Sequence, residues 1–246
     1  MNKDYKTMSV ADIVTNDYRA ADIFKKYQID FCCGGKRSVQ EACLKANGNF
    51  EKLIEELYAL KKKEIKVQNF DEWELDQLSE YIVRIHHHYV NENLDLIGQY
   101  AEKVSKVHGV QHPEVIEIAS LFAEIKNELT AHMRKEEVVL FPYITQLVGL
   151  KQKNLMAERP PFGPIQNPIK MMEMEHEHAG ELMHRIRELS QHYTAPVDAC
   201  NTYRVLFAKL EEFENDLHLH VHLENNILFP RAIELELHHT AQTAFA

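Results

Sequence analysis

The sequence predicts an all-α protein, an up-down four-helix bundle preceded by a small helical domain. Three observations support this prediction. From residue 72 onward, four long amphipathic stretches follow one another, at roughly residues 72–107, 113–148, 168–192 and 197–236. No stretch alternates apolar and polar residues as a half-buried strand does. The chain contains only 8 glycines and 8 prolines, which leaves long segments free to form uninterrupted helices.

The composition excludes several classes of protein. Of the 246 residues, 45% are hydrophobic and 27% charged, and no apolar run is long enough to cross a membrane. The formal net charge of −10 argues against a nucleic acid partner, since phosphate backbones bind basic surfaces. The first residues contain no signal-peptide pattern, and the adjacent Cys32 and Cys33 are poorly placed for a structural disulfide. We therefore expect a cytoplasmic protein with no membrane or nucleic acid partner.

The first 62 residues are expected to form a small helical domain that contains cysteines. Ser9 can cap a first helix, and Ser38 with Glu41 matches a capping box. Gly34 and Gly35 interrupt the chain between these elements. The charged run at 61–66 has little helical periodicity and predicts a linker. This divides the chain into domains at 1–62 and 70–240.

The connections between the four long stretches differ in length. Half of the prolines fall between the second and third stretches, where they predict an extended crossover: Pro160, Pro161, Pro164 and Pro168. The other connections are short, as antiparallel neighbouring helices require.

An internal repeat links the second and fourth stretches. HMRKEEVVLFP at 132–142 and HVHLENNILFP at 220–230 share a histidine, a glutamate four residues later, and Leu-Phe-Pro at the same offsets. The preceding stretches carry His86 and His176 at corresponding places. The repeat indicates one helix pair used twice, in a quasi-symmetric bundle.

A helical wheel at about 100° per residue identifies the polar side chains that face the core. In the first stretch the apolar stripe is Leu75, Leu78, Ile82, Ile85, Tyr89 and Leu96. His86 lies near the centre of this stripe, whereas His87 and His88 are predicted to face away. In the fourth stretch His222 is likewise predicted to point away from the stripe. The six inward polar residues are His86, His132, Glu136, His176, His220 and Glu224.

This set of side chains predicts a metal centre. Two ionised carboxylates in an apolar core are costly unless cations lie between them. Four imidazoles and two carboxylates without a thiolate suit iron or manganese better than structural zinc. Six ligands are too many for one ion, so we expect two ions, each with two histidines. Both glutamates would bridge the ions, and an oxo or hydroxo bridge, water or a diatomic ligand would fill the remaining positions.

These residues resemble a known family. His86, the two His-x-x-x-Glu motifs beginning at His132 and His220, and the EHEHAG run around His176 resemble the hemerythrin-like domain of the iron–sulfur cluster repair di-iron proteins. The DFCCGG run at 30–35 resembles their small cysteine-bearing domain. The resemblance covers nearly the whole chain. It implies a hemerythrin-like bundle with two non-haem irons, in a cytoplasmic stress protein that restores iron–sulfur clusters damaged by nitric oxide or oxidants, by supplying iron.

Two alternatives stay open at this point. The centre could reduce nitric oxide or peroxide, which would make the protein an enzyme, or it could bind dioxygen or nitric oxide as a carrier or sensor. The oxygen carriers of the wider hemerythrin group use a histidine where this chain has Glu224, which weakens the carrier alternative. The expected partners are damaged iron–sulfur proteins and small ligands such as nitric oxide or dioxygen. Homodimerisation is left open.

The four cysteines are expected to have different roles. Gly34 and Gly35 leave the backbone beside Cys32 and Cys33 uncrowded, which suits a thiol that must meet a metal or a partner. We assign this pair to iron transfer or thiol exchange, with burial as packing residues as the competing interpretation. Cys43 and Cys200 lie in helical patterns and are expected to be inert.

Overall fold

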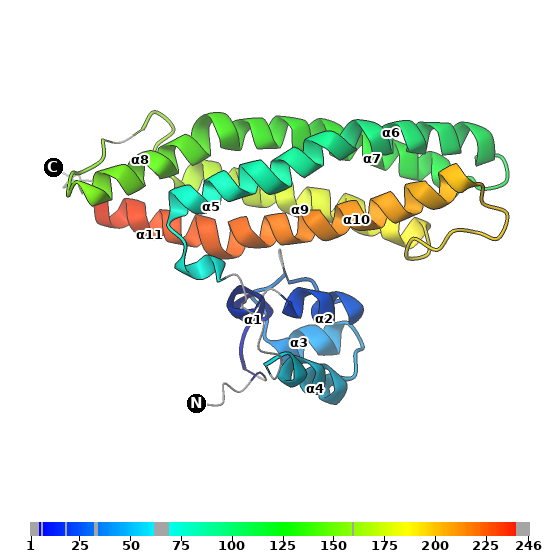
Figure 1. The fold of residues 1–246 in the computed structure, drawn as a ribbon, viewed down its shortest axis with the longest axis horizontal. Coiled ribbons are helices and arrows are strands. Elements are labelled where there is room, and N and C mark those ends of the chain that lie inside the picture. Colours follow the sequence, from blue (N-terminus) through cyan, green and yellow to red (C-terminus); the bar gives the residue numbers. More distant parts are fainter. Residues whose placement is uncertain are drawn as a thin grey trace.

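The computed structural model describes residues 5, 7–17, 19–31, 34–61, 69–158 and 160–239, and within these ranges its regular elements are all helices. The predicted all-α class is therefore confirmed (Figure 1). One isolated bridge joins Ser9 to Ser38.

Four short helices form the N-terminal unit: α1 (Val10–Asn16), α2 (Ala20–Lys26), α3 (Val39–Lys45) and α4 (Phe50–Lys61). Ser9 caps α1 by accepting a hydrogen bond from the Asp12 amide at 3.0 Å. Ser38 and Glu41 form the predicted capping box at the start of α3. The unit has its own buried apolar residues, among them Phe24 and Leu53. Beyond Lys61, the predicted linker at 61–66 lies outside the described residues.

The bundle consists of four long helices, three of which are interrupted by a π-helical turn (Figure 1). The first follows the short 3-10 helix η1 (Phe70–Glu72) and comprises α5 (Leu75–Ile82), η2 (Val83–His87) and α6 (His88–His108). The second comprises α7 (Glu114–Lys135), η3 (Glu136–Leu140) and α8 (Phe141–Gln152), and the third is α9 (Gln166–Leu189). The fourth comprises α10 (Asn201–Leu223), η4 (Glu224–Leu228) and α11 (Phe229–His239). Helix α7 lies between α6 and α9, and α10 packs against α6.

The crossover between α8 and α9 is fastened to the end of the fourth helix. The carboxylate of Glu236 accepts hydrogen bonds from the Tyr143 hydroxyl at 2.9 Å and the Ile165 amide at 3.0 Å. The Ala157 amide donates to the carbonyl of His239. These bonds satisfy buried polar groups that an extended segment would otherwise leave unpaired.

The π-turn η2 changes which residues of the first helix face the core. Leu75, Leu78 and Ile82 precede the turn and are buried as predicted. Two predicted inward residues are exposed instead: Ile85, within the turn, is 41% exposed, and Leu96, after it, is 37% exposed. The buried positions are instead Val90, Leu94 and Ile97. A π-turn holds an extra residue, so the helical wheel is out of register there and beyond it. The predicted stripe is therefore wrong at Ile85 and Leu96, whereas Tyr89 packs against the core as predicted.

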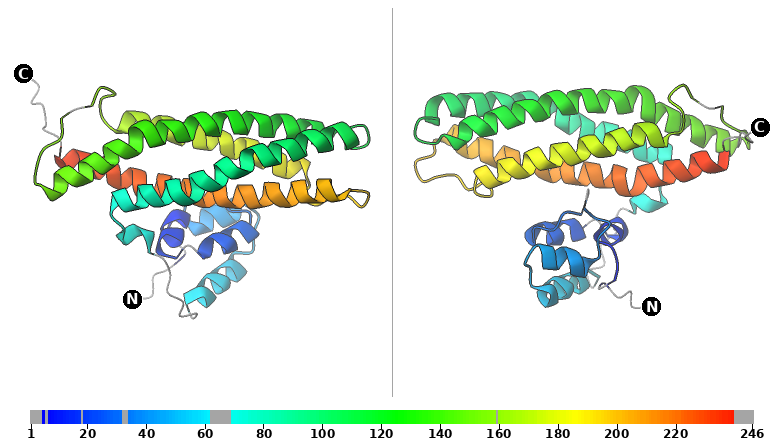
Figure 2. Two further views of the ribbon diagram at one scale, coloured as in Figure 1. Left: turned by 45° about the horizontal axis from the view of Figure 1, so that its top comes forward. Right: turned by 180° about the vertical axis from the view of Figure 1, so that it is seen from behind.

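The N-terminal unit packs against the fourth helix of the bundle (Figure 2). The Phe31 ring contacts the rings of His218 and His222, each at a centroid distance of 5.8 Å. Lys25 pairs with Glu211 at 3.6 Å. This contact covers His222, which is 1% exposed. In the part of the chain that the structure describes, no helix is long and apolar enough to span a membrane.

Candidate metal centre

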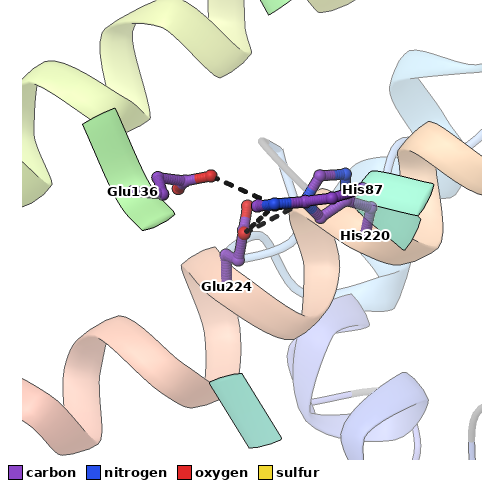
Figure 3. A group of neighbouring side chains, drawn as sticks. All are labelled: His87, Glu136, His220 and Glu224. Carbon is purple, nitrogen blue, oxygen red and sulfur yellow. Dashed lines mark hydrogen bonds and ion pairs between the residues drawn. The ribbon is translucent and has the colours of Figure 1, made fainter. Parts of the chain in front are cut away.

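The first group of candidate ligands consists of His87, Glu136, His220 and Glu224 (Figure 3). All four are buried, and one ligand atom from each lies within 4.8 Å of the others. The Nε2 atom of His87 is 3.4 Å from an oxygen of Glu136 and 3.9 Å from one of Glu224. The Nε2 atom of His220 is 3.0 Å from Glu224. Two nitrogens and two oxygens therefore surround one point in the core.

The second group consists of His132, Glu136, His176 and Glu224, again all buried. Nε2 of His132 lies 3.3 Å from Glu136, and Nε2 of His176 lies 3.1 Å from Glu224. Both glutamates belong to both groups, so each can bridge two neighbouring ions. The structure thus brings two four-residue groups together through a shared carboxylate pair.

Each imidazole but that of His220 is held through its other ring nitrogen. The Nδ1 atom of His87 bonds to Glu137 at 2.7 Å, that of His132 to Glu175 at 2.8 Å, and that of His176 to Asn225 at 2.9 Å. Metal-binding histidines in proteins are oriented in this way, with Nε2 left for the ion. These anchors were not singled out from the sequence. Each anchor lies on a different helix from the histidine that it holds, and each is next in sequence to another ligand. Glu137 follows Glu136, Glu175 precedes His176, and Asn225 follows Glu224.

The contact between His132 and His176 indicates a cation most directly. Their Nε2 atoms are 2.9 Å apart. Since both Nδ1 atoms bond to oxygen acceptors, both neutral imidazoles direct an Nε2 lone pair into the same space. Two facing lone pairs need either a proton or a metal ion between them. The donor set of imidazole and carboxylate suits iron or manganese, so these residues fit the ions expected from the sequence.

In the protein without metal, protons supply part of the positive charge among these side chains. Burial lowers the pKa of His87 and of His132, but their hydrogen bonds and charge interactions with the buried glutamates outweigh it and raise each pKa to about 10. Burial and the charge of Glu224 act to raise the pKa of Glu136. His132 and His87 act in the opposite direction and together hold this pKa below its ordinary value. The metal-free centre at neutral pH therefore pairs cationic imidazoles with anionic carboxylates.

Metal binding is expected to release about two protons at pH 8, because His87 and His132 must each lose one before Nε2 can bind an ion. Because the pKa of each histidine is about 10, the affinity for the metal should increase as the pH rises from 7 towards 10. Above pH 10, metal binding should release no protons from these histidines. Anaerobic titration calorimetry with Fe²⁺ in buffers of different ionisation enthalpy measures the released protons. A buffer-independent heat at pH 8 would contradict the predicted release.

The structure brings together five of the six residues predicted to bind the ions: His132, Glu136, His176, His220 and Glu224. In place of the sixth, His86, it brings His87, so the prediction that His87 faces away is wrong. His86 is also buried, but its Nδ1 bonds to Asp216 at 2.9 Å and its ring stacks on that of His220. The physical reason is the π-turn η2, which begins at Val83 and ends at the ligand His87, so the register of this helix has already shifted when the ligand is reached.

In the second and fourth helices the π-turn begins at the glutamate ligand itself. The angular register up to Glu136 and Glu224 is therefore that of an ordinary α-helix, and the wheel holds for them. Cys32 and Cys33 lie outside the described residues.

Comparison with known proteins gives two domain matches. The hemerythrin HHE cation binding domain matches residues 78–232, and the domain of unknown function DUF542, named ScdA_N, matches residues 6–61. The chain is 35% identical over 233 residues to the iron–sulfur cluster repair protein YtfE of Yersinia pestis (strain Pestoides F), covering 95% of this chain and 100% of that protein. YtfE of Yersinia pseudotuberculosis serotype O:1b (strain IP 31758) matches to the same extent.

Proposed function

Because the chain belongs to the family of iron–sulfur cluster repair proteins that join a ScdA_N domain to a hemerythrin HHE domain, we propose that it repairs damaged clusters by supplying iron. The observation that carries this proposal is the pair of buried groups that share Glu136 and Glu224. Such a centre can hold two irons side by side, and two ions are a usable store for clusters that have lost iron. The clients would be iron–sulfur proteins damaged by nitric oxide or oxidants.

In this proposal, His87 and His220 hold one iron, and His132 and His176 hold the other. Glu136 and Glu224, which belong to both groups, would be shared by the two irons, and the cations would offset the cost of burying two carboxylates. Each iron would be offered two imidazoles and two carboxylate oxygens, fewer ligands than the six that iron accepts. Bound iron would supply an exchangeable and redox-active pair of cations.

The surroundings of the ligands support retention of iron within the bundle. The ring of His87 stacks on Phe141 at 5.7 Å, and that of His176 stacks on Phe229 at 6.1 Å. Both phenylalanines are buried, at 4% and 1% exposure. Apolar walls of this kind limit the access of water to the ions. Release to a client therefore requires a carrier group, and we assign that task to Cys32 and Cys33.

The proposal is tested by tracing iron. Protein loaded with ⁵⁷Fe is mixed with a [4Fe–4S] dehydratase whose cluster has been damaged by nitric oxide, and the client is re-isolated. Activity should return together with ⁵⁷Fe in the client cluster, detected by Mössbauer spectroscopy. Glu224→Ala, which removes a ligand of both irons, should give neither. Iron that stays in the protein through many rounds of nitric oxide consumption would instead support a reductase.

A further inference from the structure

A second cluster of reactive side chains lies at the N-terminal end of α10, whereas the metal centre lies at the C-terminal end of α10. Cys200 is the N-cap residue of α10, with an exposed side chain. Its Sγ atom is 3.2 Å from Nε2 of His108, the last residue of α6. The expectation that Cys200 lies within a helix is therefore wrong. A thiol and an imidazole at this distance have the geometry that a nucleophile and its base require.

The imidazole of His108 is held in place by its neighbours. Its ring packs against that of Tyr203 at 5.3 Å, and Tyr203 is completely buried. The His112 ring lies 6.5 Å from that of His108 and also packs against Tyr203, at 5.7 Å. A base held on a rigid aromatic platform keeps its geometry towards the sulfur.

His112 lies beside this pair, between two carboxylates. Its Nε2 atom is 3.2 Å from Asp198 and its Nδ1 atom is 3.1 Å from Glu114. The hydrogen bond with Asp198 raises the pKa of His112. Burial has the opposite effect on this pKa, but the effect is smaller. The start of α10 contributes partial positive charge at Cys200.

We propose that Cys200 is a thiol–disulfide exchange site, activated by His108, for small disulfides. His108 accepts the thiol proton while the sulfur of Cys200 attacks one sulfur of the disulfide R–S–S–R. A Cys200–S–S–R bond forms as the original S–S bond breaks, and the leaving thiolate takes the proton from His108. Cys200 is oxidised to the mixed disulfide, and the released half of the reagent is reduced to a thiol.

This site is separate from the iron centre and does not depend on the proposed function. With a rise of about 1.5 Å per residue, Cys200 lies about 30 Å from His220 along α10. Cys43 provides an internal comparison, since it is 1% exposed and burial raises the pKa of its thiol. Trypsin places the cysteines on different peptides: Cys200 on 188–204, Cys43 on 38–45, and the vicinal pair on 27–36.

The test treats full-length protein with oxidised glutathione and follows each peptide by mass spectrometry. Cys200 should acquire glutathione at least about tenfold faster than Cys43, and faster in the folded than in the guanidinium-unfolded protein. His108→Gln should slow the reaction at Cys200 about tenfold, while the exposed control His184→Gln leaves it unchanged. Cys200→Ser should lose the adduct on 188–204 and keep its iron content.

Two results would overturn the proposal. One is a rate at Cys200 that is equal in the folded and unfolded wild-type protein. The other is an equal rate in His108→Gln and His184→Gln, with Cys43 still protected in both as evidence that they are folded. Failure of cluster repair has no bearing on either result, because adduct formation is measured without a client protein.

Discussion

Replacing His87 with alanine should cost the protein one of its two irons, whereas replacing His86 should leave both. Nε2 of His87 lies among the ligand atoms of one group, 3.4 Å from Glu136, and without it that group keeps a single imidazole. Removing a residue that hydrogen-bonds to a metal ligand weakens metal binding about 10- to 100-fold. Removing the ligand itself should therefore weaken binding by more than this. Iron content after anaerobic loading and dialysis gives the count. The spectrum of a magnetically coupled iron pair should disappear at the same time.

His86→Ala is the matched control, because it removes a buried imidazole from the neighbouring position of the same π-turn. His222→Ala serves as a second control, since this histidine is buried by the N-terminal unit and belongs to neither group. Loss of an iron from His86→Ala, with both irons kept in His87→Ala, would restore the assignment made from the helical wheel.

His86 and His87 show which part of the site the helical wheel could not predict. The four long helices, the crossover and the repeated His-x-x-x-Glu motif follow from residue spacing, because α-helices have a constant angular step. A π-turn breaks that constancy by one residue, and no pattern in the run Val83–His87 announces it. Its effect is visible beyond the ligand, since Val90 and Leu94 are buried in place of the predicted residues.

Contacts between distant segments were also beyond a reading of local periodicity. His222 faces away from the apolar stripe of its own helix, and a surface position would follow from that alone. It is buried because Phe31, from a different unit, packs against it. The pairing of Cys200 with His108 likewise joins two helix ends that are far apart in the sequence. Spacing within one helix carries no information about either contact.

The vicinal cysteines provide the second large expected effect. A Cys32→Ala, Cys33→Ala double variant should keep two irons, because the candidate ligands of both groups lie within the bundle. Its repair of damaged clusters should nevertheless fall at least about tenfold, since thiolates are strong ligands that can accept iron from one site and pass it to another. Phe31, which directly precedes the pair, packs on α10, the helix that carries His220.

The ⁵⁷Fe transfer assay measures this effect, with iron content determined on the same samples. Cys43→Ala is the matched control, because Cys43 belongs to the same N-terminal unit and is buried in α3. It should transfer iron at the wild-type rate, which separates a need for the vicinal thiols from a general need for an intact unit. If the double variant repaired clusters as fast as the wild type, the thiols would have no part in transfer. Packing would then be the better explanation for both cysteines, and release of iron would have to occur directly from the bundle.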